Sequence, residues 1–399
     1  MDGLRVLVLS HMYPREYYPA GGVFVQEQAK ALIRRGASVA VLSGEPFWIS
    51  TYDFRKVSRA LQAYLEEPFR WRVREGVPIV YFPYCVGGYF RHPLHALSYW
   101  HGVRRVIEMI RARFPFDIVH AHTSFLDGYS AIKLGKKFGR RVVLTEHMGP
   151  FSLLTRNGIL KHFTRKSVRS ADRVLAVSHA LKRDMLAELG SDAEQVQILG
   201  NGFDPQIFQL RTHPVRVHRP AQMLWLAGAG GEVKGGKRLV AAFAAALKQG
   251  ASVELSVLGS PSVHREVAVE FEKLGGAAGT IHFLPMADRK GISAAISDHD
   301  FIVVASYKET FSLSGLESLA CGRPVLTTTC GGPEDYVVSG HNGMIVGNTE
   351  GGLLDGILRM SQTYSGYDGR SIAEEVLQSR TWDAVAERLF QIYAELLLS

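Results

Sequence analysis

The sequence predicts an α/β protein with two doubly wound domains, each built around a parallel sheet. Three observations support this prediction. Short apolar runs of strand length alternate with amphipathic stretches of helix length along the whole chain. The alternation stops over residues 201–220, which are rich in Pro and basic residues, and then restarts, so this stretch is interpreted as a linker. A length of 399 residues with 46% hydrophobic content exceeds the needs of one core.

The first half of the chain contains most of a first doubly wound domain. Buried strands appear as runs rich in Val, Ile and Leu, and Gly36 ends the first helix. The elements expected, in order, are strand 4–10, helix 25–36, strand 38–44, helix 100–114, strand 117–122, a helix through Lys137, strand 141–147, a helix ending near Ser170 and strand 173–178.

Residues 45–99 do not fit this alternation, because they are dense in aromatic residues and arginine. Within them Phe54, Val57, Leu61 and Tyr64 recur at helical spacing. Two interpretations stay open. The segment is either an interfacial helix in a lobe that binds another molecule, or an ordinary helix that buries its apolar stripe on its own domain.

The second half repeats the pattern after a glycine-rich loop. The last helix is long and has a continuous apolar face. The elements expected, in order, are strand 223–230, helix 238–250, strands 252–259, 280–285 and 300–306, helix 315–322, strands 324–329 and 343–347, and helix 381–399.

The charge distribution and the cysteine content indicate which partners and which redox environment to expect. The net charge is +8, and the basic excess lies wholly in residues 1–210, which therefore attract anions. No zinc-finger, basic-zipper or RNP-like pattern occurs, so no nucleic acid partner is expected; an anionic membrane surface is a candidate partner, and a basic surface without a partner is the alternative. Cys85, Cys321 and Cys330 are odd in number and widely spaced, which favours a reducing cytoplasm.

No membrane-spanning segment or signal peptide is expected. No apolar run approaches the roughly 18 residues that a membrane span needs. The first apolar run has no basic segment before it and is interpreted as a strand. The expected location is the cytoplasm, with a peripheral position on the inner face of the membrane as a hypothesis.

The stretch 306–327 carries the most chemistry. A turn, TFSLSG, leads into a helix that starts near Ser314, and the free N–H groups of a helix N-terminus bind phosphate well. Glu317 lies about one turn inside this helix, where its carboxylate can accept hydrogen bonds from a ribose diol. Glu309 precedes the turn at the carboxyl end of a strand, where it can bind sugar hydroxyls or stabilise a cationic anomeric centre. The alternative is a pair of ordinary exposed glutamates.

This stretch resembles the E-x7-E signature of retaining, family-four GT-B glycosyltransferases. The pattern is matched in order by Ser306, Glu309, Phe311, Glu317, Ala320, Gly322, Pro324 and Val325, whereas Ser312 replaces the usual Gly and Ser318 the usual Ala. Other family marks follow in the expected order along nearly the whole chain. They are Gly21-Gly22-Val23, the strand Asp117–His122, Asn201-Gly202-Phe203-Asp204, Lys234-Gly235, Gly331-Gly332-Pro333-Glu334 and the final helix after Trp382.

The resemblance implies two Rossmann-like domains that face a central cleft. It implies an acceptor-binding domain over residues 1–205 and a donor-binding domain over 206–378. Residues 379–399 would form a helix that packs back on the first domain. The implied activity is transfer of a sugar from a nucleotide-diphosphate donor to an acceptor hydroxyl of a glycan or lipid-linked molecule, in polysaccharide biosynthesis, without a cofactor or a metal. Asp298-His299-Asp300 resembles a metal motif of another glycosyltransferase fold, but it is interpreted as a corner between a helix and a strand.

The resemblance also implies roles for the matched residues. Gly21 and Gly22 would let the backbone approach the donor diphosphate, and Lys234 would bind its phosphates. The N–H groups over Phe311, Ser312, Leu313 and Ser314 would bind the same diphosphate, and Glu317 would hold the ribose. His122 and Glu309 would orient and stabilise the sugar as catalytic residues. His147, at the end of another strand, would line the acceptor side.

One departure from the family pattern matters for catalysis. The family usually has an arginine five residues before the lysine, where this chain has Ala229. Lys237, Arg238 or backbone N–H groups of the glycine run are candidate substitutes for the missing charge. Two other functions therefore stay open: a non-catalytic relative that binds a nucleotide-sugar or glycan, and a nucleotide-sugar 2-epimerase of the same fold.

Overall fold

The chain forms two compact units, which are described separately. Unit 1 comprises Met1–Gly200 and Trp382–Ser399, and unit 2 comprises Asn201–Thr381. Unit 2 thus begins before the expected boundary at 205/206 and ends after the one at 378/379. The computed structural model describes residues 3–50, 52–87, 93–211, 220–276 and 279–398.

The interpretation of residues 201–220 as a linker is wrong for their first part. Phe203 and Phe208 are each 1% exposed, and the Phe203 N–H donates to the carbonyl of Arg380 over 3.1 Å. The segment has no regular secondary structure and therefore no periodicity, but both aromatic side chains are buried and the segment belongs to unit 2. Residues 212–219 of the expected linker lie outside the described residues.

Unit 1 is built on one sheet, in which eight strands of the described residues are ordered β3-β4-β2-β1-β5-β6-β7-β8. All neighbours are parallel except β3 and β4, so β3 is an antiparallel edge strand. The order reverses between β1 and β5, which are adjacent. The strands are β1 (Arg5–Leu9), β2 (Ser38–Trp48), β3 (Arg70–Arg74), β4 (Val77–Val86), β5 (Ile118–Ala121), β6 (Arg141–Glu146), β7 (Arg173–Ala176) and β8 (Gln197–Ile198).

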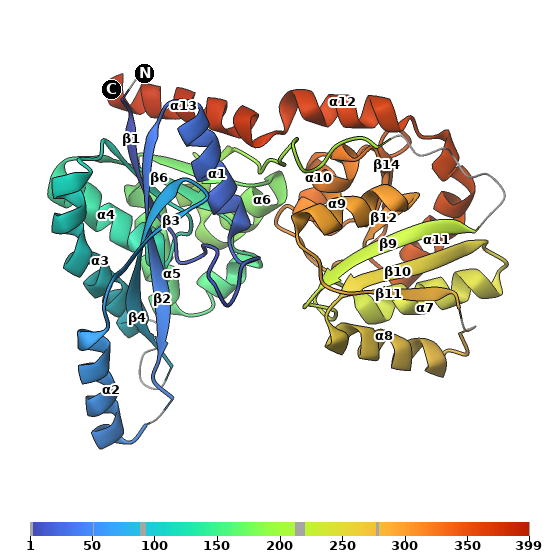
Figure 1. Cartoon of the computed structure of the whole chain (residues 1–399), viewed down its shortest axis with the longest axis horizontal. Helices are drawn as coiled ribbons and strands as arrows, with labels where there is room; N and C mark the ends of the chain where they lie inside the picture. Colours follow the sequence, from blue (N-terminus) through green and yellow to red (C-terminus); the bar gives the residue numbers. More distant parts are fainter. Residues whose placement is uncertain (1–2, 51, 88–92, 212–219, 277–278, 399) are drawn as a thin grey trace. The chain divides into compact units, whose positions relative to one another are not determined.

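Helices cover both faces of this sheet, as a doubly wound fold requires (Figure 1). α1 packs beside α13, whereas α4 packs between α3 and α5. Side-chain caps fix several starts: Asn157 and Ser178 accept hydrogen bonds from N–H groups of α5 and α6. The helices are α1 (Val23–Arg34), α2 (Phe54–Glu66), α3 (Pro93–Arg113), α4 (Leu126–Phe138), α5 (Gly158–Ser170), α6 (His179–Leu189) and α13 (Trp382–Leu398).

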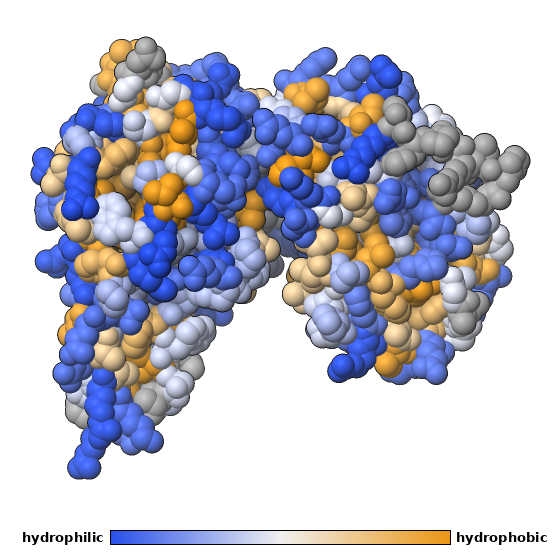
Figure 2. Space-filling model, viewed as in Figure 1, coloured by the Kyte–Doolittle hydropathy of each residue, from blue (hydrophilic) through white to orange (hydrophobic). Residues whose placement is uncertain are grey.

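The segment that resisted prediction forms a lobe of β2, α2, β3 and β4 (Figure 1). Asp53 caps α2, and the helix buries Val57 and Tyr64 against Ile49 and Cys85. Much of its apolar stripe is therefore used within unit 1. Leu65 remains 54% exposed, and hydrophobic patches interrupt the hydrophilic surface of the lobe (Figure 2).

Unit 2 has a parallel sheet, in which six strands of the described residues are ordered β11-β10-β9-β12-β13-β14. α7 packs beside α8 and α11, and α10 packs beside α9 and α12. The strands are β9 (Ala221–Gly228), β10 (Val253–Gly259), β11 (Ile281–Leu284), β12 (Phe301–Val304), β13 (Val325–Thr328) and β14 (Gly343–Val346). The helices are α7 (Gly236–Lys248), α8 (Pro261–Lys273), α9 (Arg289–Asp298), α10 (Leu313–Ala320), α11 (Glu350–Thr363) and α12 (Gly369–Ser379).

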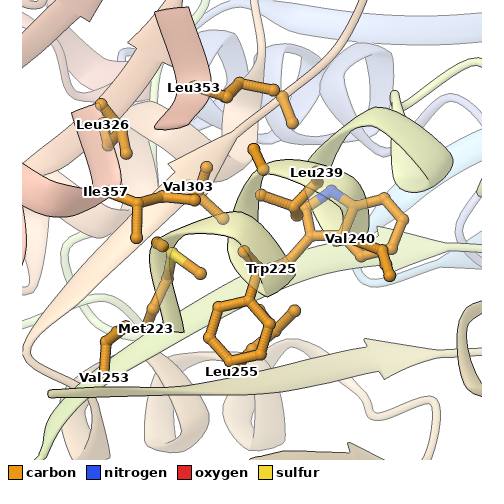
Figure 3. Packing of buried hydrophobic residues seen from close by; sticks show 14 of the residues in the cluster. Met223, Trp225, Leu239, Val240, Val253, Leu255, Val303, Leu326, Leu353 and Ile357 are labelled. Atoms are coloured by element: carbon orange, nitrogen blue, oxygen red, sulfur yellow. The ribbon is translucent and has the colours of Figure 1, made fainter. Parts of the chain in front are cut away.

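The core of unit 2 lies between the sheet and the helices α7 and α11 (Figure 3). Trp225 of β9 is 1% exposed and lies beside Leu239 and Val240 of α7, whereas Ile357 of α11 lies beside Val303 of β12. Burying one such large side chain contributes about 1.5–3 kcal/mol to folding. The core fixes β9 and β12 relative to α7, and the loops that follow these two strands carry the site described below.

The expected return of the last helix to the first domain is confirmed. α13 belongs to unit 1, where Trp382, Leu389 and Tyr393 are at most 1% exposed. On its exposed face, Arg34 of α1 binds Asp383 through Nε and Nη2 at 3.0 and 2.8 Å. Across the described residues, every helix is too short or too polar to traverse a bilayer.

Candidate active site

In unit 2, the candidate site lies where the strand order reverses, between β9 and β12. Ligands of open parallel sheets bind outside the carboxyl ends of the strands at such a point. The chain leaves β9 through residues 229–235 and leaves β12 through residues 305–312. Both loops contain residues that the sequence predicted for the donor site.

Lys234 and Glu309 lie together at this point. Lys234 Nζ is 3.2 Å from Glu309 Oε1, which also accepts a hydrogen bond of 2.7 Å from Ser306 Oγ. The backbone fixes Glu309, because its N–H donates to the Cys330 carbonyl and its own carbonyl accepts from the Gly332 N–H. The Lys234 side chain is 35% exposed and that of Glu309 15%, so a ligand can reach both.

The turn into α10 has an unusual backbone. Ser312, its N-cap residue, has a φ of 66°, in the left-handed region that favours glycine. This conformation explains why the family pattern usually has Gly here. The Tyr336 hydroxyl lies 2.6 Å from the Ser312 carbonyl and 3.1 Å from the Phe311 carbonyl, and thereby holds the turn. At Gly315, a Cβ would lie 2.5 Å from the same hydroxyl.

The predicted phosphate-binding residues can act only partly through their side chains. Phe311 is 2% exposed and packs on Tyr336 with ring centroids 5.4 Å apart, so it can meet a ligand only through its backbone. Leu313 and Ser314 are half-buried at the start of α10. The first N–H groups of a helix have no acceptor within the helix, so this end of α10 offers donors to an anion.

Glu317 sits within α10 and is 9% exposed. Arg289, at the start of α9, places Nη2 3.5 Å from Glu317 Oε1, and its guanidinium also lies over the ring of Phe208 at 5.3 Å. The arrangement orients the Glu317 carboxylate next to a positive charge.

The two side chains proposed to substitute for the missing family arginine, Arg238 and Lys237, differ in their exposure and in their hydrogen bonds. Arg238 is 9% exposed, and its Nη2 donates to the carbonyls of Ala305 and Ser306 at 2.6 and 3.3 Å. Its other terminal nitrogen, Nη1, donates to the Asn348 carbonyl at 3.0 Å. Arg238 is therefore committed to backbone carbonyls after β12 and after β14. Lys237 is exposed on α7, and Ala229 is exposed in the loop.

In unit 1, the equivalent point lies between β1 and β5. Gly22 ends the loop after β1 with a φ of 70°, and a Cβ there would lie 2.4 Å from the Met12 backbone carbonyl. Gly22 therefore must be glycine for two reasons. A Cβ on Gly21 would instead meet the ring of Tyr18 at 2.3 Å, and this ring belongs to a residue that is 58% exposed.

Three histidines form a buried stack beside this loop. The rings of His120 and His122 have centroids 4.6 Å apart, and those of His122 and His147 are 5.2 Å apart. His122 Nδ1 lies 3.1 Å from His147 Nε2, and His147 stacks on Phe24 of α1 at 4.4 Å. At the other end, His120 Nδ1 lies 2.6 Å from the Tyr393 hydroxyl. The structure thus brings the glycine loop, His122 and His147 together.

The stack is neutral at neutral pH. Burial lowers the pKa of His120 to about 3 and that of His147 to about 3. Burial, with additional effects of the two neighbouring histidines, lowers the pKa of His122 well below its usual range. His122 has both ring faces stacked and Nδ1 engaged, so it can meet a sugar hydroxyl only with its Nε2 edge.

Sequence reasoning missed two carboxylates of this region. Asp127 is fully buried and accepts from the His11 N–H at 2.9 Å, and its Oδ2 lies 2.9 Å from His11 Nδ1. Glu146 accepts from the N–H groups of Ser124 and His147, and burial raises its pKa. The available signal was position: His11 follows β1, and Asp127 lies in the helix that follows β5.

Comparison with known proteins finds matching families for both halves of the chain. The family description "Glycosyltransferase Family 4" matches residues 21–207, and "Glycosyl transferases group 1" matches residues 221–363. A D-inositol 3-phosphate glycosyltransferase of Pseudarthrobacter chlorophenolicus is 27% identical over 86% of this chain and 83% of its own length. One of Xylanimonas cellulosilytica is 25% identical over 98% of this chain and 97% of its own length.

Solved structures share the fold of the whole chain. Sucrose-phosphate synthase of Thermosynechococcus elongatus has a TM-score of 0.75 at 17% identity, covering 99% of both chains. HepE of Anabaena, in complex with UDP and glucose, has a TM-score of 0.68 at 17% identity, covering 98% of this chain and 100% of its own. The chain therefore shares the two-domain fold of these glycosyltransferases, with a segment that matches Glycosyltransferase Family 4 followed by one that matches the group 1 glycosyl transferases.

Proposed function

We propose that this protein is a retaining glycosyltransferase that moves a sugar from a nucleotide-diphosphate donor to an acceptor hydroxyl. Unit 2 would bind the donor and unit 1 the acceptor. The observation that supports this most is the Lys234–Glu309 pair, held beside the turn into α10 at the point where the strand order of unit 2 reverses. A nucleoside-diphosphate complex of the structurally similar Anabaena protein is in keeping with this donor class.

The proposed donor site handles the charge of the leaving diphosphate with groups of the chain itself. The Lys234 ammonium and the first N–H groups of α10 would bind the phosphates without a metal, and Glu317 would accept hydrogen bonds from the ribose. In a front-face reaction, the bond from C1 of the sugar to the acceptor oxygen forms as the bond to the phosphate oxygen breaks. The acceptor proton passes to a phosphate oxygen of the leaving group, so no separate base is needed.

Glu309 and His122 would act on the sugar in this proposal. Glu309 carries a carboxylate that can stabilise positive charge developing at C1. Neutral His122 would donate or accept one hydrogen bond at Nε2 rather than supply a proton. His147 would hold His122 in place and line the acceptor side.

The proposed acceptor is a glycan or a lipid-linked molecule. The curated relatives are named for D-inositol 3-phosphate, so phosphorylated polyols belong in the acceptor panel. The basic excess of residues 1–210 supports an anionic acceptor or an anionic membrane surface on the inner face of the membrane.

A thermal-shift screen of nucleoside diphosphates and their sugars tests the donor class. A ligand present at 100 times its Kd adds about 2.7 kcal/mol of stability, which is readily seen as a raised Tm. Transfer is then measured with the selected donor and the acceptor panel, with Glu309→Ala as the inactive control. The proposal fails when no nucleotide-sugar stabilises the protein and no transfer is detected.

One observation favours a second function, a non-catalytic receptor for nucleotide-sugars or glycans. Ala229 removes the arginine of the family pattern, and Arg238 is committed to three backbone carbonyls. Binding without transfer or donor hydrolysis, across the whole acceptor panel, would support the receptor. Turnover that is abolished in Glu309→Ala would support the enzyme.

A further inference from the structure

A cavity of about 210 Å³ in unit 1 is lined by none of the residues assigned above, although part of its wall comes from the loop that ends at Gly22. We call it the arginine cavity, because its lining includes Arg15, Arg70, Arg72 and Arg74. Its volume is more than ten times the roughly 10–15 Å³ that one water needs on this measure. The cavity can therefore hold a small ligand group and not only solvent.

The edge strand β3 supplies three of the four guanidinium groups. Arg70, Arg72 and Arg74 alternate along the strand, so their side chains lie on one face of the sheet. They share this face with Tyr81 of β4, since Arg70 pairs directly with Tyr81. The alternating Trp71 lies on the opposite face, beneath Arg113 of α3.

The fourth guanidinium comes from a distant part of the sequence. Arg15 lies in the loop between β1 and α1, and its Nη2 donates to the carbonyls of His11 and Gly44, each at 2.7 Å. The Tyr81 hydroxyl ties the same loop to β4 by donating to the Pro14 carbonyl at 2.7 Å. These bonds fix Arg15 at the cavity wall before any ligand arrives.

The positive charge of the cavity is not neutralised within the described residues. Glu16 and Glu45 are the acidic members of the lining, and only the pair of Arg70 with Glu45 forms an ion pair there. The Nε atoms of Arg15 and Arg74 are buried without a hydrogen-bond partner in this part of the chain. An unsatisfied buried donor costs about 1–3 kcal/mol, so neither guanidinium is fully satisfied by the protein itself.

A protective role for the edge strand does not explain these features. Charged side chains on an edge strand prevent pairing with other chains, and that accounts for arginines on β3. It does not account for Arg15, which comes from another loop and is fixed by two backbone carbonyls. It also does not require buried guanidinium nitrogens.

We propose that the arginine cavity binds a phosphoryl group. Guanidinium groups match phosphate oxygens with paired, charge-assisted hydrogen bonds, and several around one cavity suit a dianion better than a single carboxylate. In the lining, Tyr17 offers an aromatic surface and a hydroxyl group to the rest of the ligand, and Tyr81, whose hydroxyl is bound to Pro14, offers aromatic surface. The phosphoryl group can belong to a small phosphate ester or to the headgroup of an anionic phospholipid. The assignment does not depend on sugar transfer.

Binding to the full chain tests the proposal directly. Calorimetric titrations at low salt use sn-glycerol 3-phosphate, myo-inositol 3-phosphate and inorganic phosphate, and sedimentation uses vesicles of phosphatidylglycerol or of phosphatidylcholine. Each is repeated with Arg74→Gln, Arg72→Gln and the control Arg183→Gln. Arg183 is an exposed arginine on α6 of the same unit, and its substitution makes the same change in charge.

The proposal predicts that Arg74→Gln and Arg72→Gln each weaken binding tenfold or more, while Arg183→Gln leaves it within twofold. Binding of the small esters identifies a phosphorylated small molecule as the source. Binding of phosphatidylglycerol vesicles alone identifies a lipid headgroup. Equal binding by all four proteins, an equal loss in all three variants, or no binding to any probe would overturn the proposal.

A nucleoside-diphosphate thermal shift in the same samples separates this result from the proposed function. Loss of phosphoryl binding with an intact nucleotide shift shows that the substitution acts on unit 1 alone. A normal circular dichroism spectrum for Arg74→Gln confirms that the variant is folded. Failure of the nucleotide shift in the unmodified protein would count against the donor site and not against the arginine cavity.

Discussion

His122 and His147 share a short contact between two buried rings, with Nδ1 of the first 3.1 Å from Nε2 of the second. Only one of these two nitrogens can carry the shared proton when both rings are neutral. A proton added to the pair places a charge in a buried site, next to the third ring of His120. This relationship makes the stack sensitive to acid.

Acidification should destabilise unit 1 through these rings. The folded pKa of His120 is about 3, whereas an unfolded histidine titrates near 6.5, so the unfolded chain binds more protons between those values. Stability is therefore fully present above about pH 6.5 and falls as the pH drops toward 3. At pH 5 the loss is about 2 kcal/mol for one such histidine.

Denaturant unfolding at pH 7.5 and pH 5 measures this effect. In His120→Gln, the difference in unfolding free energy between the two pH values should be smaller by about 2 kcal/mol than in the unmodified protein. A difference that does not change in His120→Gln would show that this ring is protonated in the folded state at pH 5.

Lys234 and Glu309 should separate donor binding from turnover. Lys234→Ala should weaken binding of the nucleoside diphosphate by about 10–100-fold, because it removes a charge-assisted contact to phosphate. Glu309→Gln keeps the size of the side chain and should lower kcat by about 100-fold or more, with little effect on nucleotide affinity. Titration of the nucleotide and transfer assays measure the two effects. Full turnover in Glu309→Gln would contradict its role.

Gly22 and Gly21 form a matched pair in one loop. Gly22→Ala combines a positive φ with a Cβ that meets the backbone at Met12, and should cost unit 1 several kcal/mol. Gly21→Ala meets only the exposed ring of Tyr18, which can rotate away, and should cost less than about 1 kcal/mol. Urea unfolding of both variants checks the order. Equal costs would mean that the loop adjusts as a whole.

Gly315 and Tyr336 should show compensation. Gly315→Ala brings a Cβ to 2.5 Å from the Tyr336 hydroxyl and should displace the turn that starts α10, which lowers nucleotide affinity. Adding Tyr336→Phe removes the clashing oxygen, so the double variant should regain stability relative to Gly315→Ala. A double-mutant cycle on the unfolding free energy measures this coupling. Strict additivity would exclude direct contact as the cause.

Ser312→Gly should stabilise unit 2. A left-handed backbone costs a residue with a Cβ about 1–2 kcal/mol, and glycine adopts this conformation without that cost. Glycine also makes the unfolded chain more flexible, which offsets part of the gain in stability. The net gain expected is up to about 1 kcal/mol in unfolding free energy. Ser314→Gly, inside α10, is the control and should be destabilising by roughly the same amount. A loss of stability in Ser312→Gly would show that its side-chain contact with Ser314 outweighs the backbone strain.

The sequence was sufficient to predict the two doubly wound folds, because strands and helices differ in the spacing of their apolar residues, and this spacing can be read from a short stretch of sequence. The family pattern pointed to Gly22, where the structure has a positive φ that favours glycine; its role in donor binding stays a prediction. The hairpin of β3 and β4 was missed although Arg70, Arg72 and Arg74 alternate with Trp71 and Val73, which is the pattern of a strand with one exposed face. Its pairing with β4 depends on contacts that a single strand does not contain.

The direction in which side chains point was the second feature that could not be predicted from the sequence. Arg238 had the right charge and sequence position to replace an arginine, but its guanidinium donates to backbone carbonyls after β12 and after β14. The contact of His11 with Asp127 joins residues separated by more than a hundred positions. Such contacts follow only from the strand order, which places β1 next to β5.

The place of α13 sets the order in which the molecule can be completed. Unit 1 lacks Trp382, Leu389 and Tyr393 until residues 382–398 have been synthesised, although most of its chain is made first. Unit 2 is synthesised in one continuous piece and can finish folding earlier. Chains truncated before residue 382 would therefore contain a complete second unit. Their first unit would be incomplete, because His120 would lack its contact with the hydroxyl of Tyr393.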